Sequence, residues 1–385
     1  MSGGMDPLAL YIHWPFCLAK CPYCDFNSHV GDTHNQEKWR RAYKRELEHY
    51  AALLPDRRVT SVFFGGGTPS LMEAQTVASV LQDIARLWRV DEQVEITLEA
   101  NPSSVEAGKF ADFCSAGVNR LSLGVQSFNE EALKFLGRAH DAGEARRAIE
   151  IAAKTFARFS FDLIYARQGQ TPEMWMSELR EALALAGDHL SLYQLTIEPH
   201  TQFHTRARRG ENLTAPDEHS VAMYEATQAV MSAAGLPAYE ISNHARPTQE
   251  SRHNLTYWHY EDYLGIGPGA HGRYEGGRVR LATENHRAPD IWLQQVDAQG
   301  HGIKTSDPID ADTAMREALM MGLRLTEGID LEKWMKKFAT PLPHFLNPER
   351  SARLKQEGYI VEDEKTLRAT PTGLQRLNAV LGYLE

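Results

Sequence analysis

Residues 11–24 read YIHWPFCLAKCPYC, an apolar run that leads directly into three cysteines. Cys17, Cys21 and Cys24 have the spacing C-x3-C-x2-C, which lets one short loop present three thiolates to three irons of a cubane. Iron–sulfur clusters usually take four cysteines, so three ligands leave one iron open to an exchangeable ligand. The stretch therefore predicts a [4Fe–4S] cluster on these three cysteines.

A structural zinc site is the alternative interpretation of the same cysteines. Zinc would need a fourth ligand, such as His13 or His29, and structural zinc sites more often use paired C-x2-C motifs. Three of the four cysteines are clustered, which favours metal binding in a reducing compartment over disulfide bonding. The fourth, Cys114, lies in a helical pattern and is expected to be a core residue.

The composition is that of an ordinary globular protein, with 385 residues, 42% hydrophobic and 24% charged. Single cores stop growing at about 250–300 residues, so we expect two domains. The formal net charge of −10 repels phosphate backbones and anionic membranes, so nucleic acid is not an expected partner. A local arginine cluster can still hold a small acidic ligand.

The sequence carries no sign of a membrane span or a secretion signal. No apolar run approaches the roughly 20 residues that cross a bilayer. The leader MSGGMDP lacks the basic and apolar blocks of a signal peptide. We therefore expect a cytoplasmic protein.

Short apolar runs alternate with helix-period segments along the first half of the chain, which predicts a parallel sheet with helices on its outer face. Six repeats fit an open partial (β/α)6 barrel better than a closed eight-fold one. The expected strands are Leu8–His13, Val59–Phe64, Val94–Ala100, Arg120–Gln126, Arg158–Ile164 and Leu190–Ile197. We assign residues 1–235 to this α/β barrel and residues 236–304 to an aromatic-rich extension of it.

Residues 305–385 are predicted to form a small winged-helix-like domain, from three helical patterns, a strand pair and a final helix after Pro371. Such domains often bind DNA. Here the acidic run Glu362-Asp363-Glu364 lies where a basic wing would be needed, so a docking or structural role is favoured.

Polar residues stand at the predicted strand ends, where the sites of α/β barrels are built. Gly65-Gly66-Gly67-Thr68-Pro69 follows one strand and lets a ligand approach bare backbone. A phosphate loop is disfavoured, since no Gly-Lys-Ser/Thr follows and Pro69 lacks an N–H. Glu99, Gln126 and Asp162 end three other strands, although each alone is also typical of a cap or turn residue.

These motifs together resemble the radical-SAM superfamily, and within it the HemN/HemW group of oxygen-independent coproporphyrinogen III oxidases and their haem-chaperone relatives. The resemblance implies S-adenosylmethionine (SAM) on the open iron. It also implies SAM contacts from Tyr11, Tyr23, Gly66, Gly67, Thr68, Glu99, Gln126, Arg138, Asp162 and His271. Arg138 would pair with the SAM carboxylate. Ala166-Arg167-Gln168-Gly169 departs from the group's Gly-Leu-Pro-Gly, which leaves the conformation of that loop open.

A second motif, His253-Asn254-Leu255-Thr256-Tyr257-Trp258, is similar to the H-N-x-x-Y-W motif of the HemW subgroup. The resemblance implies haem binding, with His253 as axial ligand and Tyr257 and Trp258 covering the porphyrin. Alternatively, His253 is a hydrogen-bonded residue in an aromatic cluster. The glycine-rich run at residues 265–272 is not a dinucleotide fingerprint, because it opens no βαβ unit.

The resemblance favours a haem chaperone that passes haem to acceptor proteins, among them proteins of the respiratory chain, with any membrane contact made through those acceptors. The rival is a radical-SAM enzyme such as a coproporphyrinogen oxidase, which acts in porphyrin biosynthesis. The oxidases carry an additional cysteine where this chain has Phe26, and a longer N-terminal arm. No catalytic residue is assigned, and whether SAM is cleaved stays open.

Overall fold

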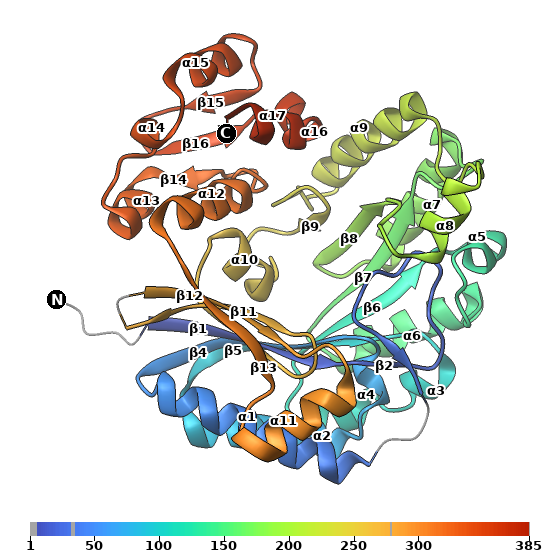
Figure 1. The fold of residues 1–385 in the computed structure, drawn as a ribbon. Coiled ribbons are helices and arrows are strands. Elements are labelled where there is room, and N and C mark those ends of the chain that lie inside the picture. Colours follow the sequence, from blue (N-terminus) through green and yellow to red (C-terminus); the bar gives the residue numbers. More distant parts are fainter. Residues whose placement is uncertain (1–5, 32–34, 278, 385) are drawn as a thin grey trace.

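The structure, a computed structural model, describes residues 6–31, 35–277 and 279–384. Most of the predicted leader, residues 1–5, lies outside the described residues. Figure 1 shows a large curved sheet lined by helices on its outer side, with a smaller C-terminal unit over one end. No helix within the described ranges has the length and apolar character that crossing a bilayer requires.

The six predicted parallel strands are confirmed, and they are consecutive neighbours in the sheet. The order does not close on itself, so the predicted partial barrel is also confirmed. The strands are β1 (Asp6–Trp14), β4 (Arg57–Gly66), β5 (Arg89–Ala100), β6 (Arg120–Gln126), β7 (Arg158–Tyr165) and β8 (His189–Gln194). Two short strands, β2 (Phe16–Cys17) and β3 (His29–Val30), pair separately at the cysteine loop.

Helices follow the strands and contact one another around the outer face. Capping residues determine where several helices begin. Asp141 and Glu144 form a capping box at the start of α6, and Thr171 caps α7 directly before Pro172. The predicted helix near Val105–Ala116 is broken in two at Gly108-Lys109. The helices are α1 (Gln36–Leu53), η1 (Pro69–Leu71), α2 (Ala74–Leu87), α3 (Ser104–Ala107), α4 (Phe110–Ser115), α5 (Glu130–Phe135), α6 (Ala142–Thr155) and α7 (Pro172–Leu185).

The segment after β8 extends the sheet at both edges. β9 pairs antiparallel with β8, whereas β10 returns to the opposite edge, lies parallel to β1 and leads into three antiparallel strands. Strand β13 runs across the predicted boundary at Thr305 and ends at Ile309. The elements are α8 (Gln202–Arg208), α9 (Asp217–Ala233), β9 (Asn243–Ala245), α10 (Arg252–Trp258), β10 (Tyr263–Ile266), β11 (His271–Gly276), β12 (Val279–Asn285), α11 (Pro289–Gln299) and β13 (Ile303–Ile309).

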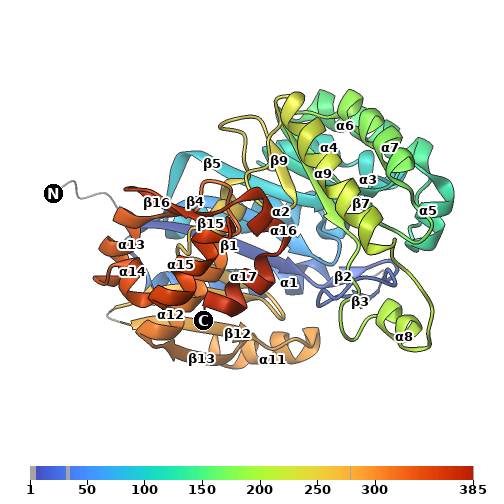
Figure 2. The same cartoon turned by 90° about the horizontal axis from the view of Figure 1, so that it is seen from above.

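The C-terminal unit has its own hydrophobic cluster, separate from that of the large sheet. The expected strand pair is present, and β14 adds a third strand to it. Figure 2 shows this unit near β12 and β13 and away from α5, α6 and α7. Its elements are α12 (Ala311–Gly322), β14 (Ile329–Asp330), α13 (Leu331–Phe338), α14 (Leu342–Phe345), α15 (Pro348–Gln356), β15 (Ile360–Glu362), β16 (Thr366–Ala369), α16 (Pro371–Gln375) and α17 (Leu377–Leu384).

Side-chain alternation along the parallel strands separates an apolar face from a polar one. Leu98, Leu121 and Leu163 belong to the large hydrophobic cluster. Their strand neighbours Glu99 and Ser122 are polar, and the strands bring these two side by side. The hydrophobic core therefore lies between the sheet and the helices, and the polar side chains of the candidate site lie on the opposite face of the sheet. Cys114 belongs to neither: it is exposed on α4, so its prediction as a core residue was wrong.

Candidate functional site

The cysteine loop leaves β1 through β2 and is held on several sides. The backbone N–H of Cys24 donates to the carbonyl of Cys21 at 3.2 Å, which closes a tight turn within the loop. The N–H of Phe203, at the start of α8, donates to the Pro22 carbonyl at 2.9 Å. Gly137, with φ +66°, packs so closely on Pro22 that a Cβ there would lie 2.6 Å from its ring. The loop is thus fixed by elements far away in the sequence.

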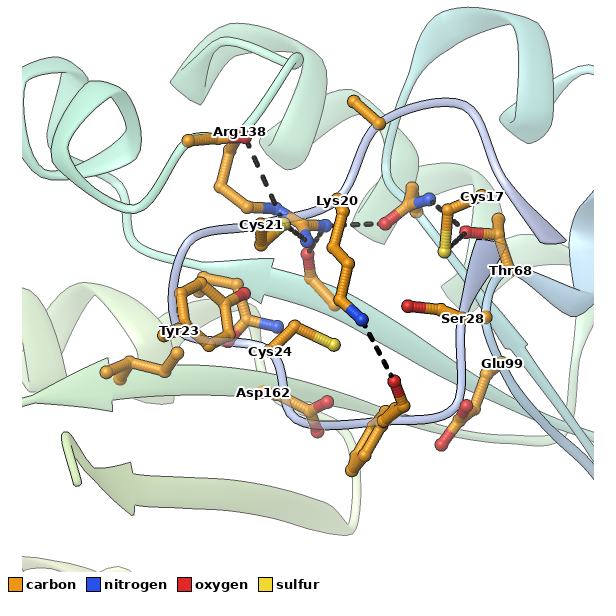
Figure 3. A pocket seen from close by; sticks show the side chains of 18 of the residues that line it. Cys17, Lys20, Cys21, Tyr23, Cys24, Ser28, Thr68, Glu99, Arg138 and Asp162 are labelled. Atoms are coloured by element: carbon orange, nitrogen blue, oxygen red, sulfur yellow. Dashed lines mark hydrogen bonds between the residues drawn. The ribbon is translucent and has the colours of Figure 1, made fainter. Parts of the chain in front are cut away.

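All three thiols line one cavity of about 480 Å³ at the carboxyl ends of the strands. Figure 3 shows Cys17, Cys21 and Cys24 around this cavity, together with Arg138, Glu99 and Asp162. Eight of the ten residues predicted to contact SAM line the same cavity. They are Tyr23, Gly66, Gly67, Thr68, Glu99, Gln126, Arg138 and Asp162.

The glycine run after β4 touches the root of the cysteine loop. The N–H groups of Gly67 and Thr68 donate to the carbonyls of Trp14 and Phe16, at 2.7 and 2.8 Å. A Cβ on Gly67 would lie 2.6 Å from the Phe16 carbonyl oxygen, so only glycine permits this approach. The Thr68 hydroxyl donates to Cys17 Sγ over 3.4 Å. The glycines therefore bring bare backbone to the wall of the cavity beside a thiol.

Arg138 reaches the cavity from the loop after α5. Its Nη1 donates to Cys21 Sγ at 3.3 Å, and its Nη2 donates to Asn101 Oδ1 at 2.5 Å and to the Gly124 carbonyl at 2.8 Å. Its Nε is buried and has no hydrogen-bond partner within the described part of the chain. A guanidinium held in this way supplies positive charge beside the thiols and can bind a carboxylate.

The carboxyl groups of Glu99, on β5, and Asp162, on β7, line the cavity from the polar face of the sheet. Burial, together with the negative charge of Asp162, raises the pKa of Glu99 to about 8. Burial also raises the pKa of Asp162 to about 6. Glu99 accepts a hydrogen bond from the Gly66 N–H at 3.3 Å. These groups would ionise more readily if a cation or a hydroxyl-rich ligand replaced the solvent around them.

Gln126 combines two features that are typical of functional sites. Its φ of +71° places it in the left-handed region, which a residue other than glycine seldom adopts. Its Oε1 is buried, and none of the residues that the structure describes forms a hydrogen bond with it. A buried acceptor left open in a cavity wall is suited to a ligand donor.

The loop after β7 keeps a left-handed turn although it lacks the expected glycine. Ala166 has φ +58°. Arg167 is buried, donates to the Ile164 carbonyl at 2.7 Å, and forms an ion pair with Glu178 at 2.8 Å. The departure from Gly-Leu-Pro-Gly therefore places a buried ion pair at the turn that follows β7.

Sequence reasoning missed several residues of the same wall. Asn101 bonds both Arg138 and Thr68, and Ser122 and Tyr193 line the cavity. They could have been predicted from the sequence, because side chains alternate between the two faces of a strand and these positions share the face of Glu99 and Asp162. Ser122 is the register partner of Glu99 on the adjacent strand.

Tyr11 and His271 lie outside the cysteine cavity. Both line a neighbouring cavity of about 370 Å³, together with Tyr257. The two cavities share Phe26 as a lining residue, and Phe26 is 57% exposed. Tyr11 donates to or accepts from His13 Nδ1 at 3.2 Å, so its hydroxyl is directed along its own strand.

The three residues predicted to bind haem do not face a common cavity. His253 is 1% exposed, and both ring nitrogens are bonded: Nδ1 to the Ser61 hydroxyl at 2.9 Å and Nε2 to the Tyr257 hydroxyl at 2.7 Å. Burial lowers the pKa of His253 to about 3, so the ring is neutral. Trp258 lines a separate cavity beside the C-terminal unit. Ligation of haem iron by His253 would require one of these two bonds to open.

The donor set suits a cluster better than a single ion. Among the described residues, no three His, Cys, Asp or Glu side chains converge on one point that would hold a metal ion. His13, one suggested fourth zinc ligand, is bonded through Nε2 to the Asn27 carbonyl at 2.9 Å. Burial raises the pKa of Cys17 and of Cys24, so metal binding would have to release their protons. Thiols spread around a shared cavity fit the separate corners of an iron–sulfur cubane.

Comparison with known proteins agrees with this geometry. Residues 11–182 match the Radical SAM superfamily, and residues 309–376 match the HemN C-terminal domain. The chain is 37% identical to the heme chaperone HemW of Escherichia coli over 383 residues, which cover 98% of both proteins. It is 36% identical to the mitochondrial radical S-adenosyl methionine domain-containing protein 1 of Danio rerio, over 97% of this chain and 86% of that one.

Among solved structures, the chain is similar to coproporphyrinogen III oxidase (HemN) of Escherichia coli, a radical SAM enzyme. The TM-score is 0.82 at 24% identity, and the match covers 98% of this chain and 90% of the other. This likeness shows that the two proteins share the fold, from the partial barrel through the C-terminal unit.

Proposed function

Because the chain belongs to the radical SAM superfamily, and within it to the group of the HemW proteins, we propose that it is a haem chaperone. It would bind a [4Fe–4S] cluster and SAM, bind haem as cargo, and pass that haem to acceptor proteins. We place it in the cytoplasm, where thiols stay reduced.

One observation carries the cofactor part of the proposal: the three thiols, the carboxyl groups of Glu99 and Asp162, and the Arg138 guanidinium line the same cavity. Cys17, Cys21 and Cys24 would hold the cluster. The backbone at Gly66 and Gly67 would meet one end of SAM, with Thr68 and Tyr23 at the same wall. Arg138 is suited to the SAM carboxylate, and Glu99, Gln126 and Asp162 offer acceptors for its ammonium and hydroxyl groups.

The chemistry that the cofactors would supply is one-electron chemistry at an iron with an open coordination position. The protein itself would bind the cofactors, orient them and shield them from solvent. Arg138 holds positive charge at Cys21, and Thr68 donates to Cys17, so both sulfurs are stabilised as acceptors. The mouth of the cavity is lined by Lys20 and Phe26, and the Lys20 ammonium donates to the Phe26 carbonyl at 3.3 Å.

The haem part of the proposal is supported by the names of the relatives and by the aromatic segment that follows β9. The rival function is oxidative decarboxylation of coproporphyrinogen. Phe26, at the cavity mouth, occupies the position of the additional cysteine of those oxidases. No thiol is available there, which favours the carrier.

The test uses anaerobically reconstituted full-length protein. We expect haem titration to give a saturable Soret band, and mixing with an apo-haem protein such as apomyoglobin to transfer the haem. Absence of saturable haem binding would contradict the proposal. Formation of vinyl groups on coproporphyrinogen, with multiple turnovers and release of 5′-deoxyadenosine, would replace it by the oxidase.

A further inference from the structure

Asn101, directly after β5, joins two parts of the cysteine cavity that lie far apart in the sequence. Its side chain contacts Thr68, which follows β4, and Arg138, which follows α5. Asn101 Nδ2 donates to the Thr68 hydroxyl at 3.3 Å, and Asn101 Oδ1 accepts from Arg138 Nη2 at 2.5 Å. One amide therefore bonds both residues and uses a different end for each.

Each of these two partners donates in turn to a cysteine thiol. The Thr68 hydroxyl donates to Cys17 Sγ at 3.4 Å, and Arg138 Nη1 donates to Cys21 Sγ at 3.3 Å. Figure 3 shows both of these bonds at the wall of the cavity. Two chains of hydrogen bonds thus start at the Asn101 amide and end at two different thiols.

Glu106, on α3, anchors Asn101. Its side chain is buried, with the residue 3% exposed. Glu106 Oε2 accepts the Asn101 backbone N–H at 2.9 Å, and Oε1 accepts Asn101 Nδ2 at 3.4 Å. The hydroxyls of Ser70 and Ser103 also donate to this carboxylate. Glu106 therefore holds both the backbone and the side chain of Asn101.

Only one orientation of the Asn101 amide satisfies these contacts. A flipped amide would turn its NH2 group toward the Arg138 guanidinium, which is itself a donor, and its oxygen toward the Glu106 carboxylate, which is an acceptor. In the observed orientation the Thr68 hydroxyl accepts from Asn101, so its own proton is directed to Cys17. The amide therefore determines where both donors to the thiols point.

Hydrogen bonds to the sulfurs of an iron–sulfur cluster are one of the terms that set its reduction potential. A donor places partial positive charge beside the sulfur, which stabilises the cluster more after it has gained an electron, and this raises the potential. We propose that Asn101 is a positioning residue that sets the reduction potential of the cluster through Thr68 and Arg138. This inference rests on the cluster of the proposed function, and it is independent of haem binding.

The experiment is a redox titration of the anaerobically reconstituted full-length protein, followed by electron paramagnetic resonance of the reduced cluster. We expect Asn101→Ala to lower the equilibrium constant for reduction about tenfold, which is about 59 mV for one electron. Asn119→Ala is the matched control. The Asn119 amide also bonds two groups, the Ile96 N–H and the Val94 carbonyl, but it lies before β6, at the strand end opposite Gln126. This control should keep the potential of the wild type.

Thr68→Val tests one of the two chains with a side chain of nearly the same shape. It removes the donor to Cys17 and should also lower the potential, by less than Asn101→Ala, because Arg138 keeps its place. If Asn101 acts through Thr68, the double variant should shift the potential by less than the sum of the two single shifts. Additive shifts would contradict this route. Glu106→Gln loosens Asn101 and should lower the potential in the same direction.

Iron and sulfide content and circular dichroism check that each variant is loaded and folded. A wild-type potential in Asn101→Ala would overturn the inference. Where Asn101→Ala holds no cluster, wild-type potentials in both Thr68→Val and Glu106→Gln would overturn it. An equal shift in Asn119→Ala would also overturn it, since the effect would then come from general loosening of the fold. A wild-type protein that takes up no cluster would contradict the proposed function, and this inference with it.

Discussion

Arg138 Nη1 lies 3.3 Å from Cys21 Sγ, so the guanidinium predicted to bind SAM is bonded to a predicted cluster ligand (Figure 3). Arg138 thus connects the predicted cluster site with the predicted SAM site. Its Nη2 donates to Asn101 Oδ1 and to the Gly124 carbonyl, which fixes the plane of the guanidinium. Arg138 lines the cavity together with the three thiols, so it provides fixed positive charge beside them.

Replacing Arg138 with Gln should weaken SAM binding. The change removes a charge-assisted bond, which contributes about 1.5–3 kcal/mol, or roughly ten- to a hundredfold in the dissociation constant. Equilibrium dialysis of SAM against anaerobically reconstituted protein measures this. Arg147→Gln, at an exposed position on α6, is the matched control and should bind like wild type. Equal affinity in the two variants would show that Arg138 does not contact the ligand.

Glu99 predicts a pH dependence of SAM binding. With its pKa raised to about 8, Glu99 is protonated at neutral pH in the free protein. SAM carries a sulfonium and an ammonium, which favour the ionised carboxylate and lower that pKa. Binding should therefore release a proton, and affinity should rise between about pH 6 and pH 8. Calorimetry in buffers of different ionisation enthalpy measures the release. Glu99→Gln should abolish it, and release that persists in the variant would assign it to another group.

Gly66 is predicted to be irreplaceable for steric reasons. Its φ is +111°, and a Cβ would lie 2.5 Å from the His13 ring. Gly210, with φ +89°, has no atom within 4 Å of such a Cβ. Gly210→Ala should therefore cost only the left-handed strain of about 1–2 kcal/mol. Gly66→Ala should lose a further ~1–3 kcal/mol from overpacking. Urea unfolding of the cofactor-free proteins compares the two, and equal losses would show that the His13 ring moves freely aside.

Glu46 stabilises the connection between α1 and the sheet extension. Its fully buried carboxylate accepts the N–H groups of Gly267 and Gly302, both at 2.7 Å, and those of Asn285 and Trp292. Glu46→Gln places an amide donor against these donors, and we expect a loss of about 3 kcal/mol in unfolding free energy. The nearby Glu48→Gln, which breaks a surface ion pair with Arg86, should change it by less than about 1 kcal/mol. Similar losses for both would contradict this role.

The fold was largely predictable, because alternating strands and helices leave a strong periodic signal. The six parallel strands and the C-terminal unit follow from it. The pairing of β10 with β1 could not be predicted from this periodicity, because pairing between strands so far apart in sequence depends on tertiary packing. The break at Gly108-Lys109 is a boundary that helical periodicity does not resolve.

Site residues could be predicted where a family motif and the alternation of side chains along a strand both indicate the same position. Glu99 and Asp162 were found in this way, and Arg120, on the same polar face, was missed although it is buried and bonded to Thr97 and Ser160. His253 shows the limit of a motif. The motif contains the imidazole, and the Tyr257 hydroxyl that bonds its Nε2 lies one turn later in the same helix. The bond from Nδ1 to Ser61 is not visible in the motif, because it comes from the way α10 packs against β4.

The most direct test of the account is the iron content of single-cysteine variants after anaerobic reconstitution. Cys17→Ala, Cys21→Ala and Cys24→Ala should each lose the brown chromophore, since each removes one of the three thiols around the cavity. Cys114→Ala, which removes the exposed thiol on α4, should keep the iron and sulfide content of the wild type. Retention of a full cluster by any of the first three variants, or binding of one zinc ion by the wild type in its place, would contradict the account.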